Sequence, residues 1–146
     1  MAIPIMILGD SGSGKTRSAK SLKPEETLII QPIKKPLPFR SSEWKPWDKD
    51  AKSGSVFRCD KYQIIKKWID GAESMGKKYI VIDDAQYIML NDELRRSDEV
   101  GFKKFVEMAK DYVDLITHIT NHDSNLIVYF MTHTETQDDG HISAKT

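Results

Sequence analysis

Near its N-terminus the chain reads LGDSGSGKT, from Leu8 to Thr16, directly after the apolar run IPIMI at residues 3–7. Three glycines fall in six positions of this segment, and glycine is costly to order unless a side chain would obstruct the backbone. The residues fit the pattern G-x-x-x-x-G-K-[ST], in which backbone N–H groups surround a phosphate and the following helix points its positive end at it. The segment therefore predicts a phosphate-binding loop, with a strand before it at 4–8 and a helix after it at 15–22.

The loop pattern gives its residues separate roles at a bound nucleotide. We expect Lys15 to reach the β- and γ-phosphates and the hydroxyl of Thr16 to bind Mg²⁺. The residues expected to contact the nucleotide are Gly9, Asp10, Ser11, Gly12, Ser13, Gly14, Lys15, Thr16 and Arg17. The alternative, a flexible Gly/Ser linker, is disfavoured by the apolar run and the helical pattern on either side. The motif indicates a nucleoside triphosphate and does not specify the reaction.

The length of 146 residues predicts a single domain with a sizeable core, spanning 1–146. Lys and Arg together number 22, as do Asp and Glu, so the net charge of zero does not indicate a nucleic-acid or membrane partner. The single cysteine, Cys59, cannot form a disulfide within the chain. No apolar run approaches the ~20 residues of a membrane span, and the chain begins with a strand pattern rather than a signal peptide. We therefore expect a cytoplasmic protein that does not bind membranes.

Apolar runs alternate with helical patterns along the chain. Four runs predict buried strands, at residues 4–8, 27–31, 79–83 and 125–131. The helical patterns are one that Asp60 can cap and Gly76 can end, and a longer one with apolar residues at 102, 105, 106, 109, 112, 113, 116 and 119. Residues 33–57 contain many charges and prolines without a period, which indicates a long loop or hairpin insertion. The alternation predicts an α/β fold with a mainly parallel sheet covered on both faces.

The segment IDDAQ, residues 82–86, places two acids at the end of the third predicted strand. Ligands of open α/β sheets bind beyond the carboxyl ends of the strands. A buried carboxylate needs a partner, and the Mg²⁺ bound by Thr16 would supply one for Asp83. Asp84, one residue further on, would then be free to orient or deprotonate an attacking water. The alternative for both acids is a helix N-cap before AQYIML.

The segment MTHTE, residues 131–135, ends the last predicted strand. If the sheet has the order common to hydrolytic P-loop proteins, this strand lies between the first and the third, which gives the strand order 1-4-3-2. Thr132 and His133 would then face the γ-phosphate, and His133 could donate a hydrogen bond that reports whether this phosphate is present. The alternative is an ordinary histidine on the protein surface.

The motifs GDSGSGKT, IDDAQYIM and LIVYFMTHTE, in this order and spacing, resemble those of bacteriophage-type RecA-like P-loop ATPases, which are associated with phage recombination and single-strand annealing. The likeness covers nearly the whole chain. It implies a RecA-like three-layer core, Mg-ATP as the ligand, oligomers, and single-stranded DNA or a phage recombination protein as the partner, in the cytoplasm of a bacterial host. It supports catalytic roles for Lys15, Asp84 and His133. It also supports Thr16 and Asp83 as magnesium ligands.

A RecA core differs from this chain in two places. RecA carries a catalytic Glu after its second strand, where this chain has Gln31, so the catalytic role passes to Asp84. A RecA core also continues beyond the point that corresponds to Thr146, so we expect the chain to lack one or more C-terminal strands. The strand at 4–8 would then be an edge strand, which another chain could pair with. If such strands are missing, residues 140–146, including Lys145, would form a tail that could reach a partner's ATP.

Three further patterns each have a structural and a functional interpretation. His118 and His122 have the spacing of metal ligands on a helix, but no third ligand is evident. Arg95 and Arg96 form either an arginine finger for a neighbouring subunit or a solvated helix face. A basic and aromatic segment either stacks the bases of single-stranded DNA or anchors a loop, and it contains Lys34, Lys35, Phe39, Arg40, Trp44, Lys45 and Trp47.

Three functions use a phosphate-binding loop of this kind. The first is an ATPase that couples hydrolysis of Mg-ATP to a nucleic-acid transaction. The second is a small-molecule kinase, which needs an acceptor pocket that is commonly lined by arginines on a mobile lid, and no arginine-rich segment of this kind is evident. The third is an adaptor that binds nucleotide without hydrolysing it.

Overall fold

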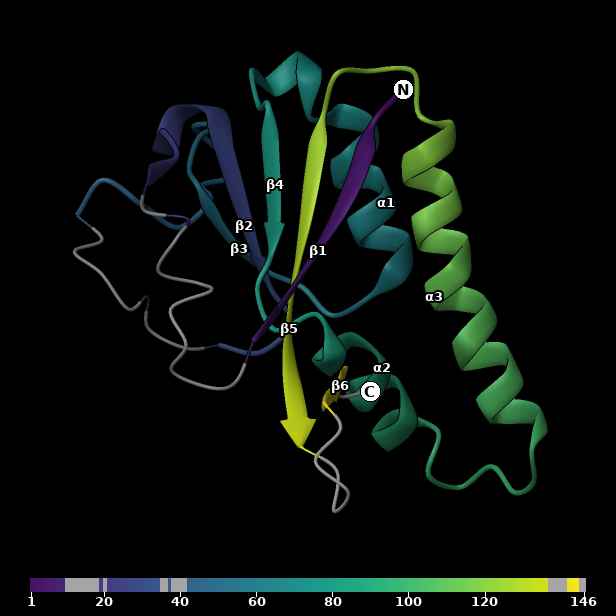
Figure 1. Ribbon diagram of the computed structural model, residues 1–146. Helices are drawn as coiled ribbons and strands as arrows, with labels where there is room; N and C mark the ends of the chain where they lie inside the picture. Colours follow the sequence, from purple (N-terminus) through teal and green to yellow (C-terminus); the bar gives the residue numbers. More distant parts are fainter. Residues whose placement is uncertain (10–18, 20, 35–36, 38–41, 137–141, 145–146) are drawn as a thin grey trace.

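The computed structural model describes residues 1–9, 19, 21–34, 37, 42–136 and 142–144 (Figure 1). This part of the chain has an α/β fold with five parallel strands and three α-helices. Most of the helix predicted at 15–22 lies outside the described residues, as does most of the predicted tail at 140–146.

The parallel strands are β1 (Ile3–Gly9), β2 (Thr27–Gln31), β3 (Val56–Arg58), β4 (Tyr79–Ile82) and β5 (Ile127–Thr136). Their spatial order is β1-β5-β4-β2-β3. The four strands predicted from the apolar runs are all present, and they lie in the predicted order. A short strand, β6 (Ile142–Ala144), pairs antiparallel with the end of β5. The described sheet is therefore mainly parallel, as uninterrupted apolar runs indicate.

The largest differences from the predicted strands are an added strand, β3, and a longer β5. β3 begins inside the segment at 33–57 that was expected to be a loop or hairpin, and it pairs with β2 from Ile29 to Gln31. None of its three residues is buried, so its apolar pattern is too weak to predict a strand. β5 continues to Thr136, past the expected end at residue 131, because β6 pairs with its last three residues.

The α-helices are α1 (Tyr62–Gly71), α2 (Gln86–Arg95) and α3 (Lys103–Asn121), and short 3₁₀ turns lie at Pro24–Glu26 and Glu73–Met75. All three α-helices pack on one face of the sheet (Figure 1). Their core residues contact the strand positions Leu28, Ile30, Ile80, Ile82, Val128 and Phe130. The alternate strand positions face the other side of the sheet, where Ile29, Val81 and Met131 form a second core with Ala19 and Trp44. Both faces are covered, and in the described residues only the first is covered by α-helices.

The expected cap of α1 is wrong. The N-cap position of α1 is Lys61, which makes no side-chain cap bond. Asp60, the expected cap, instead accepts hydrogen bonds from Asn91 and Arg95. The carboxylate of Asp60 therefore joins α2 to the start of α1, and it does not cap the first turn of α1.

The apolar residues of α3 form two stripes rather than one. The stripe that faces the core consists of Met108, Leu115 and Ile119, with Tyr112 and Ile116 packed beside it. The expected core positions Phe102, Phe105, Val106, Ala109 and Val113 are exposed instead. At about 100° per residue, the exposed row lies roughly a quarter turn around the helix from the buried row. Five of the eight predicted apolar positions therefore point away from the core.

The tryptophans at 44 and 47 anchor the long loop to the sheet. Trp44 is buried in the second core, and the ring of Trp47 packs edge-on against Trp68 of α1, with 4.9 Å between ring centroids. The backbone N–H of Trp47 donates to the carbonyl of Val56 at the start of β3 (2.8 Å). The anchoring interpretation is therefore confirmed for these two rings. The other aromatic member of the segment, Phe39, lies outside the described residues, as do Lys35 and Arg40.

The buried hydroxyl of Tyr62, at the start of α1, makes the stability of the helical core depend on pH. Its side chain is 8% exposed, and its hydroxyl has no hydrogen-bond partner among the described residues. Burial raises the pKa of Tyr62, and the neighbouring Tyr112, whose ring meets it edge-on, adds to this shift. Because the folded state holds this proton more tightly than the unfolded state, stability is complete below a pH of about 10 and declines above it.

We expect Tyr62→Phe to raise the free energy of unfolding at neutral pH by about 1 kcal/mol, since it removes a buried hydroxyl that has no partner. We also expect it to reduce the decline in stability above pH ~10. Urea unfolding at several pH values measures both effects. Tyr129→Phe, on the opposite face of the sheet, is the matched control. A destabilised Tyr62→Phe protein would contradict the absence of a partner for this hydroxyl.

Candidate functional site

The carboxyl ends of β1, β4 and β5 meet at one edge of the sheet (Figure 1). Backbone pairing places Gly9, the first glycine of the loop motif, beside His133. After β4 the chain bonds to both neighbouring strands. The N–H of Asp83 donates to the carbonyl of Ile30 on β2 (2.9 Å), and the N–H of Ala85 donates to the carbonyl of Met131 on β5 (2.8 Å). The acidic pair therefore lies between β2 and β5, and β5 adjoins the strand that leads into the glycine-rich segment.

Asp83 continues the pairing of β4 with β2 by one residue. Its side chain is 1% exposed. Its position alternates with Val81, so it lies on the side of the sheet that carries the second core. A carboxylate at the end of a buried strand offers the oxygen ligands that Mg²⁺ prefers. Its placement is therefore compatible with the predicted magnesium ligand.

Asp84 has a left-handed backbone, with φ of 56°, and its side chain is 3% exposed. Asp is one of the few residue types that adopt this conformation at moderate cost. The turn carries the chain out of β4 and into α2, whose N-cap position is Ala85. Neither acid occupies the cap position, so the helix-cap alternative is wrong for both. A buried residue in an unfavourable conformation is a feature that clusters at functional sites.

Thr132 and His133 lie within β5 rather than beyond its end. Thr132 pairs with Leu8 of β1 and is 3% exposed. Its hydroxyl has no hydrogen-bond partner in the part of the chain that the structure describes. A buried hydroxyl that lacks a partner is costly, so this group is suited to contact a ligand or the loop residues nearby. The side chain of His133 lies outside the described part of the structure.

The other residues of the predicted nucleotide site lie outside the described residues. They are Asp10, Ser11, Gly12, Ser13, Gly14, Lys15, Thr16 and Arg17, and Lys145 of the predicted tail lies outside as well.

Two buried glutamines at the same edge were not assigned to the site from the sequence. Gln31 ends β2 and is 4% exposed, and Gln86 begins α2 and is 6% exposed. Amide side chains can both donate and accept hydrogen bonds, so they suit a site that binds phosphate and water. The available signal for Gln86 was its place two residues after Asp84.

A polar network fixes α2 against the end of β2. The side-chain amide of Asn91 donates to the carbonyl of Pro32 (3.2 Å) and to the carboxylate of Asp60 (3.0 Å). Arg95 donates to the same carboxylate (2.9 Å). The network joins the helix that follows the acidic pair to the chain directly after Gln31. Asn91 could not be identified from local sequence, because its partners lie 31 and 59 residues away.

Arg95 and Arg96 are both engaged by acids of the same chain. Arg95 pairs with Asp60, and Arg96 pairs with Glu99 (2.7 Å) and with Glu107. Arginine fingers must reach into a neighbouring site. These contacts favour the solvated helix face over the arginine finger.

His118 and His122 face a carboxylate of α1. Their Nε2 atoms lie 2.7 Å and 3.6 Å from the same Oδ1 of Asp70, and Nδ1 of His122 lies 2.8 Å from the hydroxyl of Ser124. Across the described ranges, no group of three or more His, Cys, Asp or Glu is arranged to hold a metal ion. These contacts join α3 to α1 near the amino ends of β4 and β5.

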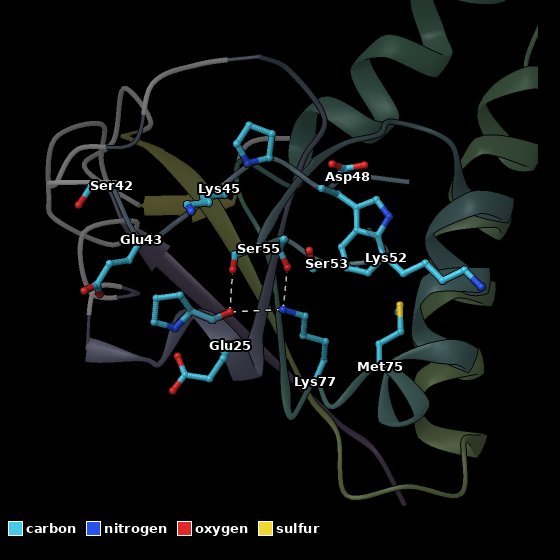
Figure 2. A pocket seen from close by; sticks show the side chains of 14 residues that line it. Glu25, Ser42, Glu43, Lys45, Asp48, Lys52, Ser53, Ser55, Met75 and Lys77 are labelled. Carbon is cyan, nitrogen blue, oxygen red and sulfur yellow. Dashed lines mark hydrogen bonds between the residues drawn. The ribbon is translucent and has the colours of Figure 1, made fainter. Parts of the chain in front are cut away.

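A cavity of about 910 Å³ lies near the amino ends of β2 and β4, away from the carboxyl ends that carry the acidic pair (Figure 2). Lys77 lies in its wall and donates to the carbonyls of Gly54 (2.7 Å), Thr27 (3.1 Å) and Pro24 (3.3 Å). Burial lowers the pKa of Lys77. Because three carbonyls use all three donors of the ammonium group, Lys77 holds the loop against β2 rather than offering a charge to a ligand.

No family model matches the sequence, and no match is found among curated proteins. None of the helices in the described ranges has both the length and the apolar character needed to cross a membrane.

Proposed function

We propose that the chain is a RecA-like P-loop ATPase that binds and hydrolyses Mg-ATP. One observation carries this proposal: the end of β1, where GDSGSGKT begins, lies at the same edge of the sheet as the buried acids Asp83 and Asp84. β5 is the strand between β1 and β4, so the two strand ends are about 10 Å apart, or two strand spacings. A phosphate held after β1 and a cation held after β4 would therefore be neighbours.

Each proposed site residue has one task in this arrangement. Lys15 contacts the β- and γ-phosphates, and backbone N–H groups of Gly9 to Arg17 surround them. Thr16 and Asp83 hold Mg²⁺, which neutralises charge that develops on the phosphate oxygens. Asp84 orients or deprotonates the attacking water. His133 donates a hydrogen bond that depends on the γ-phosphate.

The proposed client is single-stranded DNA or a phage recombination protein, in the cytoplasm of a bacterial host. This part of the proposal is supported by the resemblance of the three motifs to phage RecA-like ATPases. The packed rings of Trp44 and Trp47 do not offer a stacking platform, so DNA would contact another surface.

A small-molecule kinase and a nucleotide-binding adaptor are the competing functions. A kinase lid needs arginines that can move onto the substrate, whereas Arg95 and Arg96 are paired with acids of their own chain. An adaptor would not need an acid beside the water site. The buried, left-handed Asp84 therefore favours hydrolysis over binding alone.

Phosphate release from Mg-ATP, with and without single-stranded DNA, tests the proposal. We expect phosphate release that requires Mg²⁺ and increases when single-stranded DNA is added, with duplex DNA as the matched control. Transfer of phosphate to a nucleoside or sugar would instead establish a kinase. Nucleotide binding without either reaction would establish an adaptor.

A further inference from the structure

β1 is an edge strand with exposed apolar side chains. Among the described strands it pairs with β5 alone, from Ile3 to Gly9. Four of its large side chains are exposed, by 48% for Ile3, 36% for Ile5, 46% for Met6 and 50% for Leu8, whereas Ile7 packs against the second core. Soluble proteins usually protect such an edge with charges or bulges, because it invites pairing with another strand. β1 carries no charged residue.

The direction of the backbone groups along β1 follows from one hydrogen bond. The N–H of Ile3 donates to the carbonyl of Leu126 (2.9 Å), which precedes β5. Because successive residues of a strand point their N–H and C=O groups to opposite sides, the odd-numbered residues of β1 face β5. Pro4, Met6 and Leu8 therefore face outward. Pro4 lacks an N–H, so the outward donors are those of Met6 and Leu8, and the outward acceptors are all three carbonyls.

We propose that β1 pairs antiparallel with β1 of a second copy of this chain, about a two-fold axis at Met6. At the axis the two Met6 residues exchange two hydrogen bonds. On either side, the N–H of Leu8 donates to the carbonyl of Pro4 in the other copy. This register uses every outward N–H of both strands, and the one bond missing on each side of the axis is the bond that the carbonyl of Leu8 would accept from Pro4. An axis at Pro4 would lose its central hydrogen bonds, since proline cannot donate.

The side chains agree with the same register. The cross-strand pairs are Pro4 with Leu8, Ile5 with Ile7, and Met6 with Met6, all of which are apolar. Apolar cross-strand pairs stabilise antiparallel strands. The net charge of zero also removes any general repulsion between two copies. The strand itself is therefore complementary to a second copy of the same strand.

α3 supplies further apolar surface for the same contact. It is the helix next to β1 in Figure 1. A two-fold axis normal to the sheet places the α3 helices of both copies on the same face of the joined sheet. The exposed stripe of α3 then offers contact area beyond the strand pair, which alone is small for a stable interface.

A cysteine at the axis tests both the dimer and its register. In a hydrogen-bonded antiparallel pair the Cα atoms are about 5.5 Å apart, which lies within the range of a disulfide. We expect Met6→Cys to form a disulfide-linked dimer under mild oxidation. Ile3→Cys is the matched control, because its two copies would lie about 20 Å apart in this register. Cys59, the natural cysteine, is buried, so the unchanged chain should not cross-link.

The mass in solution provides the second measurement. We expect sedimentation of the unchanged chain to show a dimer, and Met6→Lys to show a monomer, because charges on an edge block strand pairing. Val100→Lys, at an exposed position between α2 and α3, is the control and should remain dimeric. Circular dichroism verifies that the variants fold. A monomeric unchanged chain, or a dimer that cross-links through Ile3→Cys and not through Met6→Cys, would overturn the proposal.

Discussion

ATP turnover should fall by about 10²- to 10³-fold in the Lys15→Ala variant, the range observed when one group that stabilises transition-state charge is removed. The reason is that Lys15 supplies the cation that the loop pattern directs to the β- and γ-phosphates. The fold should remain intact, because Lys15 belongs to the loop motif of the sequence and to none of its apolar runs. Phosphate release measures turnover, and titration with a fluorescent ATP analogue measures affinity.

Lys23→Ala is the matched control for Lys15→Ala. Lys23 is an exposed lysine shortly after the motif, and no ligand role is assigned to it. Its loss should leave both turnover and affinity near the values of the unchanged protein. If Lys15→Ala retained full turnover, GDSGSGKT would be a linker and the proposed nucleotide site would be wrong.

Four strands could be predicted because each depends on a short, local pattern, whereas their order was taken from the order common to hydrolytic P-loop proteins. The middle of TLIIQ and the whole of YIVI are uninterrupted apolar runs, which occur when both faces of a strand are buried. The observed order β1-β5-β4-β2 matches the order that the motifs indicated. β3 could not be predicted, since its three residues become a strand only because β2 lies beside them.

The outer stripe of α3 shows the limit of a pattern based on helical spacing. Phe102, Val106 and Val113 have the spacing of a core face, yet they are exposed. Helical spacing identifies residues that share a face, and it does not identify which face meets the sheet. The chain direction out of α2 and the contacts of Met108 and Leu115 determine that choice, and these are long-range features.

The acidic part of the site was predictable, and its surroundings were not. Asp83 and Asp84 follow an apolar strand directly, so their place at the carboxyl edge follows from the strand itself. The left-handed backbone of Asp84 is not visible in the sequence, because it arises from bonds of its neighbours to β2 and β5. Asn91 was likewise missed, since its partners come from distant segments.

Asp84→Asn should lower phosphate release by about 10²-fold or more, the lower part of the range for loss of a general base. The amide cannot accept a proton from water, whereas it keeps the size of the side chain. Asn also tolerates the left-handed conformation that φ of 56° requires, so the turn into α2 should be preserved. Nucleotide affinity should stay near that of the unchanged protein, because Asp84 is not proposed to touch the phosphates.

Asp83→Asn separates the role of the metal ligand from that of the base. Asp83 precedes Asp84 and is equally buried, but it is proposed to hold Mg²⁺. Its loss should raise the Mg²⁺ concentration needed for half-maximal phosphate release, whereas Asp84→Asn should lower the maximal rate at unchanged Mg²⁺ dependence. Asp98→Asn, at an exposed position after α2, controls for the loss of one negative charge. Full hydrolysis by Asp84→Asn would remove this residue from the catalytic step and leave it with the turn between β4 and α2 alone.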